Sequence, residues 1–430
     1  MFYVFLCGKE NFGKMGGRSF TSAQSGAAAC VAIAVAASAV SGCIGIIEIS
    51  EEGKEDTEGI WTGPGVNISE SDRSVCYATG FDYPEGYDWK TGGETGSVRC
   101  SLVVFADGVP MLKLAAGEGY EVSTDPDMHK IIDGHLYTTF CSDGQTIIKK
   151  DGKALFRHEG KESIRGMIVH DGDLFTLGVP YNGEGFTFRK NGQTVMERRA
   201  GYVFERLNMD CGKICFAFCQ KVTTTDGLVE RYYLVRDGRI SLVDLRDETT
   251  KVWDIMSHQG ETCSLVTSGP WDTMELSKGE IKVNVGIPQG AEMVASRMFS
   301  AGDDLCVEGM YCHNGMTAGG IWVEGEEYML FETGQSVSAV CATADDICCV
   351  LNPDQDNPVG LIFKSGRTYT MPDGYSCMGN SPSAVHDGNL YVGLTSSKGS
   401  NPLIWKDGTT QALRLNGPLC SLTFSSDESE

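Results

Sequence analysis

The residues with the clearest potential for metal chemistry are three cysteines spaced four apart, Cys211, Cys215 and Cys219. Cysteine thiolates are preferred ligands of zinc, which they bind at about 2.3 Å. On an extended strand, however, residues four positions apart are separated by about 13 Å. Because Cys215 and Cys219 would then be too far apart to share one ion, we predict no metal site here.

The common signatures of catalysis are missing from the sequence. It contains no G-x-S-x-G nucleophile elbow, no phosphate-binding P-loop and no H-E-x-x-H zinc motif. The acidic run at 354–357 lacks the EF-hand calcium pattern. Three histidines, His170, His258 and His386, precede predicted turns, and we interpret them as structural. We therefore assign no catalytic residue and no cofactor, and we favour a protein that is not an enzyme.

Aromatic side chains recur in segments that vary in length and lie near acidic residues. Rings in such positions can stack on sugars or hold the side chains of a peptide, because they combine a large apolar face with a polar edge. The alternative is that these rings fold back and cover an edge of the domain. The candidate ligand-binding residues are Tyr83, Tyr87, Trp89, Tyr181, Trp271, Tyr311 and His313.

A repeated turn indicates which elements must position these residues. Two-residue turns with glycine second recur eight times between apolar segments, 40 to 46 residues apart. Asp-Gly and Asn-Gly favour type I′ hairpin turns, because both central positions need positive φ. The eight pairs are Asp107-Gly108, Asp151-Gly152, Asn191-Gly192, Asp237-Gly238, Lys278-Gly279, Glu324-Gly325, Ser365-Gly366 and Asp407-Gly408.

A second signature, an apolar residue followed by cysteine or an aromatic, lies upstream of each turn. With two further short apolar stretches it gives four strands per unit, which we name a to d. Units of about 40–45 residues with four strands are typical of a β-propeller blade. The strand-b pairs are Val75-Cys76, Leu136-Tyr137, Leu174-Phe175, Ile214-Cys215, Thr262-Cys263, Leu305-Cys306, Ile347-Cys348 and Leu390-Tyr391.

The repeat therefore predicts an all-β fold, a β-propeller of eight four-stranded blades over residues 65–430, with seven blades as the second choice. Residues 419–426 read as a strand a with no strands b to d behind it. We expect this C-terminal strand to complete the first blade and close the ring. Residues 66–69 could fill the same place.

Propeller geometry assigns the connections to two faces. The a–b and c–d turns share one face and are short here, whereas the b–c loops lie on the other face and vary in length. Variable loops on a rigid scaffold are where function usually lies. We therefore predict that ligands bind on the b–c face, where the candidate aromatic residues fall.

The seventeen cysteines would normally suggest disulfides in an exported chain. Here the second position of the strand-b pair holds cysteine in five units and an aromatic in three, which indicates a buried packing site. Equivalent cysteines of neighbouring blades would lie about 10 Å apart, too far for a bridge. Cys306 and Cys312 could pair across a loop and are the first disulfide to test, whereas the adjacent Cys348 and Cys349 should point to opposite faces.

The N-terminal region reads as an export signal. Basic residues precede an apolar run at 27–40, and Val40-Ser41-Gly42-Cys43 follows directly. The length of the apolar run fits a signal peptide, and the small residues before the cysteine resemble the lipobox of bacterial lipoproteins. We predict a lipoprotein signal peptide over 1–42, lipidation at Cys43 and an acidic tether over 43–64. The alternative is a short buried helix that ends in a chance cysteine.

The charge restricts the partners. The chain carries 58 acidic and 35 basic residues, a formal net charge of -23. Because an acidic surface repels a phosphate backbone, we expect no nucleic-acid partner. No window holds the roughly 20 apolar residues of a membrane-spanning helix. We therefore expect a monomer that contacts the membrane through its lipid alone.

The last unit resembles a known repeat. Its sequence Asp-Gly-Asn-Leu-Tyr-Val-Gly at 387–393, followed by Leu-Ile-Trp-Lys-Asp-Gly at 403–408, is similar to repeats of secreted bacterial β-propeller lipoproteins. Those repeats pair a VYVAG-like strand with a WKNG-like turn, and residues 186–192 are similar. The resemblance implies the fold and an anchored location at the bacterial outer membrane, and it implies no catalytic residue.

Three hypotheses about function remain open at this point. The first is a non-enzymatic binding or scaffold module of the cell envelope, with a glycan or a protein as ligand. The second is a carbohydrate-active hydrolase or lyase that uses two carboxylates near the axis. The third is a purely structural envelope protein.

Overall fold

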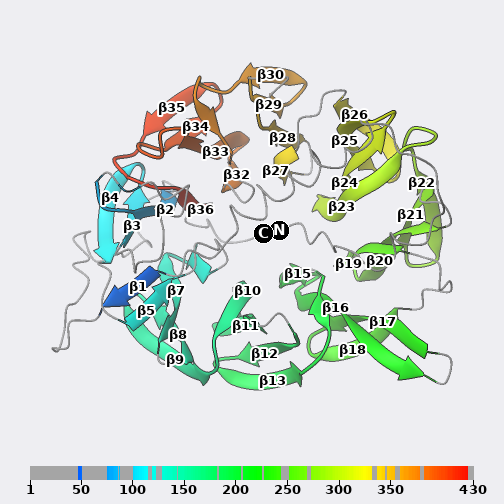
Figure 1. Ribbon diagram of the computed structural model, residues 1–430, viewed down its shortest axis with the longest axis horizontal. Helices are drawn as coiled ribbons and strands as arrows, with labels where there is room; N and C mark the ends of the chain where they lie inside the picture. The colour runs from blue at the N-terminus through cyan, green and yellow to red at the C-terminus, as the bar shows by residue number, and fades with distance from the viewer. Residues whose placement is uncertain are drawn as a thin grey trace, which may run out of the picture.

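The computed structural model describes residues 47–50, 75–85, 87, 100–114, 119–122, 128–142, 144–181, 184–204, 207–224, 227–243, 251–268, 273–331, 337–343, 346–353, 359–377 and 382–424. These residues form strands and turns and no α-helix. None of them therefore belongs to a helix long and apolar enough to cross a bilayer. Figure 1 shows the strands as a closed wheel, with the chain colour running once around it.

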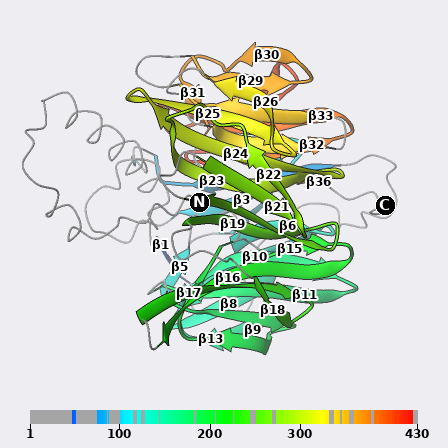
Figure 2. The same ribbon diagram turned by 90° about the vertical axis from the view of Figure 1, so that its right-hand side faces the viewer.

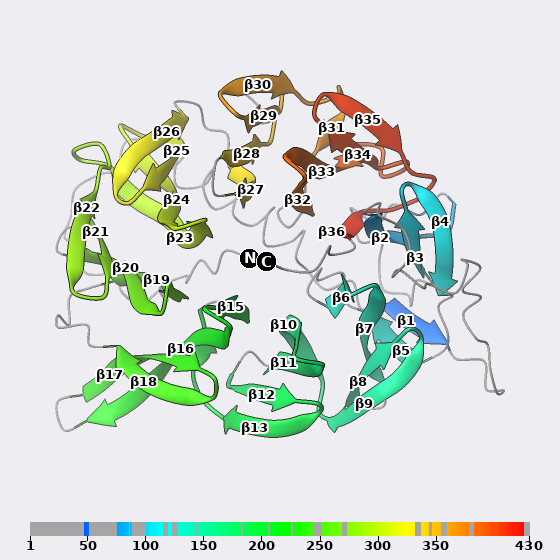
Figure 3. The ribbon, with the colours of Figure 1, turned by 180° about the vertical axis from the view of Figure 1, so that it is seen from behind.

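The wheel consists of eight antiparallel sheets, each of which is one blade, so the prediction of an eight-bladed propeller is confirmed. The inner strand is strand a and the outer strand is strand d (Figure 3). Blade 1 contains β36 (Leu419–Phe424), β2 (Cys76–Asp82), β3 (Ser101–Ala106) and β4 (Val109–Leu114). Blade 2 contains β6 (His129–Ile132), β7 (His135–Ser142), β8 (Gln145–Lys150) and β9 (Lys153–Glu159). Blade 3 contains β10 (Glu162–His170), β11 (Asp173–Pro180), β12 (Phe186–Lys190) and β13 (Gln193–Arg198).

The strand order is the same in the remaining blades. In blades 4 and 8 two short strands share the place of strand a. Blade 4 contains β14 (Tyr202–Val203) and β15 (Asn208–Asp210), then β16 (Lys213–Thr224), β17 (Gly227–Arg236) and β18 (Arg239–Val243). Blade 5 contains β19 (Lys251–His258), β20 (Glu261–Ser268), β21 (Thr273–Lys278) and β22 (Ile281–Val285). Blade 6 contains β23 (Glu292–Ala301), β24 (Asp304–His313), β25 (Met316–Val323) and β26 (Glu326–Phe331). Blade 7 contains β27 (Val337–Ala342), β28 (Ile347–Leu351), β29 (Leu361–Lys364) and β30 (Arg367–Thr370). Blade 8 contains β31 (Tyr375–Ser376) and β32 (Ser383–His386), then β33 (Asn389–Ser396), β34 (Leu403–Lys406) and β35 (Thr409–Ala412).

Two further strands extend blade 2. β5 (Gly119–Val122) pairs with β7, and β1 (Ile47–Ser50) pairs antiparallel with β5. β1 lies inside the segment that we predicted to be a solvated tether.

The ring is closed by β36, as predicted. This C-terminal strand pairs with β2 from Cys76↔Phe424 to Gly80↔Leu419. Blade 1 thus combines residues 76–114 with the last described strand, and Figure 1 shows β36 beside β2. The alternative closing segment, residues 66–69, lies outside the described residues.

The described core consists of eight hydrophobic clusters, and each lies between two neighbouring blades. The cluster between blades 5 and 6, for example, joins Leu265 and Met274 to Trp322, which is fully buried. A twisted four-stranded sheet is too small to bury its own apolar face, so each blade buries it against the next. Figure 2 shows the resulting thick disc from the side.

The predicted turns close the strand c to strand d hairpins in all eight blades. At Asp107-Gly108 the φ angles are +46° and +78°, as a type I′ turn requires. Blade 5 differs from the prediction by one residue. Lys278 pairs with Ile281, so the turn residues are Gly279 and Glu280, and only the glycine has positive φ (+57°). This is a type II′ pattern, in which glycine comes first.

The strand-b position that we interpreted as a packing site is buried or half-buried in every blade. In blade 1 the predicted pair is shifted by one residue. The first residue of the c–d turn donates its N–H to the Cys76 carbonyl in blade 1 and to the Leu136 carbonyl in blade 2. Tyr77, the residue after Cys76, is therefore the structural equivalent of Tyr137. The position therefore holds four cysteines and four aromatics.

The predicted Cys306–Cys312 disulfide is wrong. Both residues lie on the uninterrupted strand β24, six positions apart, and both thiols are free. Six strand residues span about 20 Å, far beyond the 7 Å limit for bridged Cα atoms. Cys348 and Cys349 do point to opposite sides of β28, because they belong to the clusters on opposite faces of blade 7.

Candidate ligand-binding cleft at the closure of the ring

Two of the predicted ligand-binding residues pack on each other at the b–c end of blade 1. Tyr83 is 7% exposed, and its ring stacks on that of Tyr87 with the centroids 5.4 Å apart. Its N–H donates to the Asn416 carbonyl over 3.0 Å, and its carbonyl accepts from Asn416 Nδ2 over 3.1 Å. Burial raises the pKa of the Tyr83 hydroxyl well above its ordinary value. The Tyr83 ring therefore covers the blade rather than facing solvent.

The other predicted residues belong to different blades. β24 and β25 form one hairpin with a tight turn at Asn314-Gly315, so Tyr311 lies within a strand, 5% exposed and packed on Trp322. His313 is half-buried at the end of the same strand. In blade 3 the half-buried Tyr181 places its hydroxyl 3.5 Å from Cys141 Sγ. The remaining predicted site residues, Trp89, Trp271 and Cys43, lie outside the described residues.

The opposite face, which carries the a–b and c–d turns, has a repeated polar lock. In blade 2 the Asp151 N–H donates to the Leu136 carbonyl (2.8 Å), and the Leu136 N–H donates to Asp151 Oδ1 (2.9 Å). The first turn residue thus fastens the c–d turn to the start of strand b. The same two bonds recur at Asp107, Asn191, Asp237 and Glu324.

A cation adjoins this lock, because strand c ends in lysine in five blades and in arginine in one. Where strand b offers an aromatic ring, the ammonium lies over that ring in its own blade. Where strand b offers cysteine, the cation contacts the next blade instead. The ring contacts are Lys150 on Tyr137, Lys190 on Phe175 and Lys406 on Tyr391; the contacts to the next blade are Arg236 on Ser257, Lys278 on Glu324 and Lys364 on Asp407.

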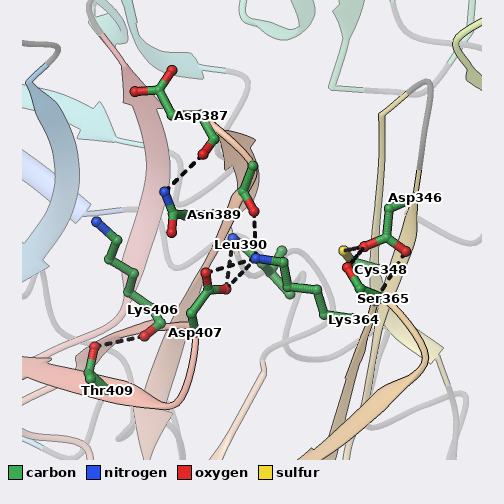
Figure 4. A network of polar contacts seen from close by, with 11 residues as sticks. Asp346, Cys348, Lys364, Ser365, Asp387, Asn389, Leu390, Lys406, Asp407 and Thr409 are labelled. Atoms are coloured by element: carbon green, nitrogen blue, oxygen red, sulfur yellow. Dashed lines mark hydrogen bonds and ion pairs between the residues drawn. The ribbon is translucent and has the colours of Figure 1, made fainter.

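Figure 4 shows how the cation of blade 7 holds blade 8. Lys364 Nζ lies 2.7 and 2.8 Å from the two carboxylate oxygens of Asp407 and donates to the Gly388 carbonyl over 2.6 Å. Asp407 Oδ1 also accepts from the Leu390 N–H. Both turns of blade 8 on this face are therefore fixed by one ammonium group.

Next to this network a cleft of about 500 Å³ lies between blade 8 and blade 1, and Figure 4 shows part of its polar side. Its volume is in the range of small-molecule sites. The lining combines apolar and polar groups of both hydrogen-bonding types. The lining residues are Cys76, Asp107, His386, Asp387, Asn389, Tyr391, Ile404, Lys406, Thr409, Thr410, Gln411 and Phe424.

The aromatic part of the cleft is a fixed group of rings. The His386 and Phe424 rings are parallel with centroids 4.3 Å apart, and Tyr391 meets the Phe424 ring edge-on at 4.6 Å. Lys406 Nζ lies 4.9 Å from the centroid of the Tyr391 ring. The hydrogen bond that the Lys406 ammonium donates to Tyr391 is the first cause that raises the pKa of Lys406, so the ammonium stays charged at neutral pH.

The cleft lies at a junction where a polar residue replaces an apolar one. In four other blades the glycine of the c–d turn faces an apolar residue on strand d of the preceding blade: Phe156, Val195, Val283 or Tyr369. At the closure the glycine is Gly108 and the facing residue is Gln411, whose Nε2 donates to the Asp107 carbonyl over 3.0 Å. This substitution, visible as Thr-Thr-Gln at 409–411, is the signal that our sequence reasoning missed.

The groups of the cleft suit binding better than covalent chemistry. Burial raises the pKa of the Cys76 thiol to about 12, so the nucleophilic thiolate is scarce at neutral pH. Among the described residues no cluster of three or more histidines, cysteines or acids could hold a metal ion. Lys406 and the carboxylates Asp107 and Asp387 instead offer both signs of charge at one opening.

Three buried carboxylates elsewhere in the described chain are engaged by structural partners. Glu162 binds Arg189 through two bonds, and Glu308 lies 2.6 Å from an Arg297 nitrogen. Asp254 accepts from the backbone N–H of Met298 over 2.7 Å. They belong to blades 3, 6 and 5.

Comparison with known proteins gives similar structures but no family. No protein-family model and no curated protein sequence matches the chain. Similar solved structures include the β-propeller domain of the Trilobed protease from Pyrococcus furiosus, with 11% identity over 70% of this chain and 92% of that one, and a TM-score of 0.41. A puromycin-hydrolyzing peptidase of Mycobacterium tuberculosis has 9% identity over 69% of this chain and a TM-score of 0.45. The chain spans about half of that peptidase, 51%. At these identities the similarities carry no activity to this protein.

Proposed function

We propose that this protein is a non-enzymatic β-propeller that binds a saccharide in the cleft between blades 8 and 1. The observation that carries the proposal is the composition of the cleft: a fixed aromatic group next to charged and amide side chains. A pyranose ring has an apolar C–H face and a polar rim of hydroxyls, so it matches both parts. The proposal moves the expected binding site from the b–c face to the turn face.

The charges of the cleft favour an uncharged sugar. Asp107 and Asp387 together outweigh Lys406, and the whole chain has a net charge of -23. A sugar carboxylate would meet this negative field, whereas neutral hydroxyls can donate to the acids and accept from Lys406. We therefore expect methyl glucosides and methyl mannosides to bind better than the methyl glucuronide.

The test is saturation-transfer NMR and calorimetry of the full chain with these methyl glycosides. Lys406→Met should weaken binding of the neutral glycosides by about tenfold or more. A hydrogen bond to a charged group contributes about 1.5–3 kcal/mol, and a tenfold change in Kd corresponds to about 1.4 kcal/mol. Lys150→Met is the matched control, because Lys150 also ends a strand c and lies over a strand-b tyrosine, but in blade 2. Absence of glycoside binding, or equal effects of the two substitutions, would refute the proposal. Binding of a peptide instead would refute the saccharide as ligand.

We propose further that a lipid on Cys43 holds the propeller at the bacterial outer membrane. The support is the apolar run and the Val40-Ser41-Gly42-Cys43 sequence after it. Cys43→Ala should move the protein from the membrane fraction to the soluble fraction and abolish incorporation of a fatty-acid label. Unchanged labelling in this variant would remove the anchor from the proposal.

A further inference from the structure

The cleft lies across the point at which the ring is closed without a covalent bond. The chain continues from blade 8 directly into β36, so these elements form one side of the closure. β2, β3 and the turn from β3 to β4 form the other side, and the two sides meet where β36 pairs with β2. Of the lining residues, Cys76 and Asp107 belong to the second side and the rest to the first.

We propose that occupancy of the cleft and closure of the ring are coupled, so that a bound saccharide holds the ring shut. This inference rests on the proposed function. If β36 separated from β2, Cys76 and Asp107 would leave the cleft and remove one wall. A ligand that touches both walls therefore binds the closed ring more tightly than an open one, and by thermodynamic linkage it favours the closed ring.

The side-chain hydrogen bonds across the closure are unevenly distributed along β36 and β2. We therefore expect a ligand to stabilise the closure most at the cleft end. At the b–c end, Asn416 binds Asp82 Oδ1 and the Tyr83 and Pro84 carbonyls. In the middle, Thr79 Oγ1 and Ser421 Oγ lie 2.6 Å apart and are buried. At the cleft end, the side-chain hydrogen bond across the closure is that of Gln411 to the Asp107 carbonyl, which is exposed.

At the cleft end, aromatic contacts hold β36 against blade 8. Phe424 is the last residue of β36, opposite Cys76, and its ring packs on His386 and Tyr391 of blade 8. These three rings are on the same side of the closure. A sugar that packs on them and also bonds Asp107 adds a polar contact across the closure beside the exposed bond of Gln411.

The experiment measures hydrogen exchange of backbone amides in the full chain, with and without methyl α-glucoside and methyl α-mannoside. Amides of β36 and β2 should exchange about tenfold more slowly at a glycoside concentration ten times its Kd. Amides of β16 and β17 in blade 4 are the internal control and should change little. Because this measurement uses the unmodified protein, it does not depend on the folding of a variant.

The closure is also tested with a pair of substitutions. Thr79→Ala removes the buried hydroxyl contact of the closure without touching the cleft, so it should speed exchange of the β36 and β2 amides in the free protein, and saturating glycoside should slow that exchange again. Ser264→Ala removes a 2.6 Å hydroxyl contact to Ser277 inside blade 5 and should leave exchange of the β36 and β2 amides unchanged. Glycoside binding without slower exchange in β36 and β2 would overturn the coupling alone. If neither glycoside binds, the coupling and the proposed function are both overturned.

Discussion

Removal of Arg189 should be among the most damaging single changes to this fold. Its guanidinium nitrogens Nη1 and Nη2 donate to Glu162 Oε2 and Oε1 over 2.6 and 2.8 Å. Both side chains are only 7% exposed, so water screens the pair little. Arg189→Met keeps most of the side-chain length but leaves the Glu162 carboxylate buried without its counter-charge.

The magnitude follows from that geometry. Breaking a buried ion pair by removing one partner typically costs about 3–5 kcal/mol, whereas replacing both partners by apolar groups is often neutral. We expect Arg189→Met to lower the free energy of unfolding by about 3–5 kcal/mol, a large part of the 5–15 kcal/mol typical of proteins. The double variant Glu162→Leu/Arg189→Met should recover most of this loss.

The assay is urea unfolding followed by tryptophan fluorescence and far-UV circular dichroism, analysed as a double-mutant cycle. Arg199→Met is the control, because Arg199 is 93% exposed and its pair with Glu197 spans 3.6 Å. Exposed pairs of this kind contribute about 0–1 kcal/mol. A cost below about 1 kcal/mol for Arg189→Met, or no recovery in the double variant, would contradict the reasoning.

Three further predictions concern Gly325, His158 and Cys211. Gly325→Ala should cost more stability than Gly152→Ala by about 1–3 kcal/mol: both glycines have positive φ, but a Cβ at Gly325 would lie 2.8 Å from Val283 Cγ2, whereas Gly152 has open space. Equal midpoints in urea would exclude this packing role. Burial, followed by the charge of Arg189, lowers the pKa of His158 from its ordinary 6.5, so the folded state binds fewer protons and stability should fall as pH drops below about 6.5. His158→Gln should flatten that part of the stability–pH curve, and an unchanged slope would refute the assignment. Of the described cysteines, Cys211 should react first with iodoacetamide in the native protein, because it is exposed while burial raises the pKa of Cys263 and Cys306 to about 12. Mass spectrometry that finds Cys263 alkylated first would contradict this.

The blades could be predicted because their signals are local. An Asp-Gly turn needs two positive φ angles and nothing from the rest of the chain, so the pattern from Asp107 to Asp407 indicates hairpins directly. The number of blades and the closing strand followed from the spacing alone. The one-residue shift at Lys278 has the same origin, because Gly279 can begin a type II′ turn as well as end a type I′ turn.

The candidate site was harder to predict because it depends on contacts between blades. In the sequence Tyr83 and Tyr311 look like exposed loop aromatics, yet both are buried: Tyr311 lies within β24, and Tyr83 packs against Tyr87 just after β2. Conversely, Lys406 and Gln411 sit in an ordinary turn and an outer strand, and only the meeting of blade 8 with blade 1 brings them to Asp107. A position-by-position comparison of the eight units would have flagged Gln411, since its counterparts in four other blades are apolar.

The order of the strands has a consequence for how this protein is made. β36 is synthesised after every other described strand of the wheel, yet it supplies the inner strand of the first blade. Until residues 419–424 have been synthesised, β2 lacks β36 as its inner neighbour, and the edge of β2 that pairs with β36 stays open. A premature stop codon within residues 419–424 should therefore harm the whole molecule, because it removes a strand on which the closure of the ring depends.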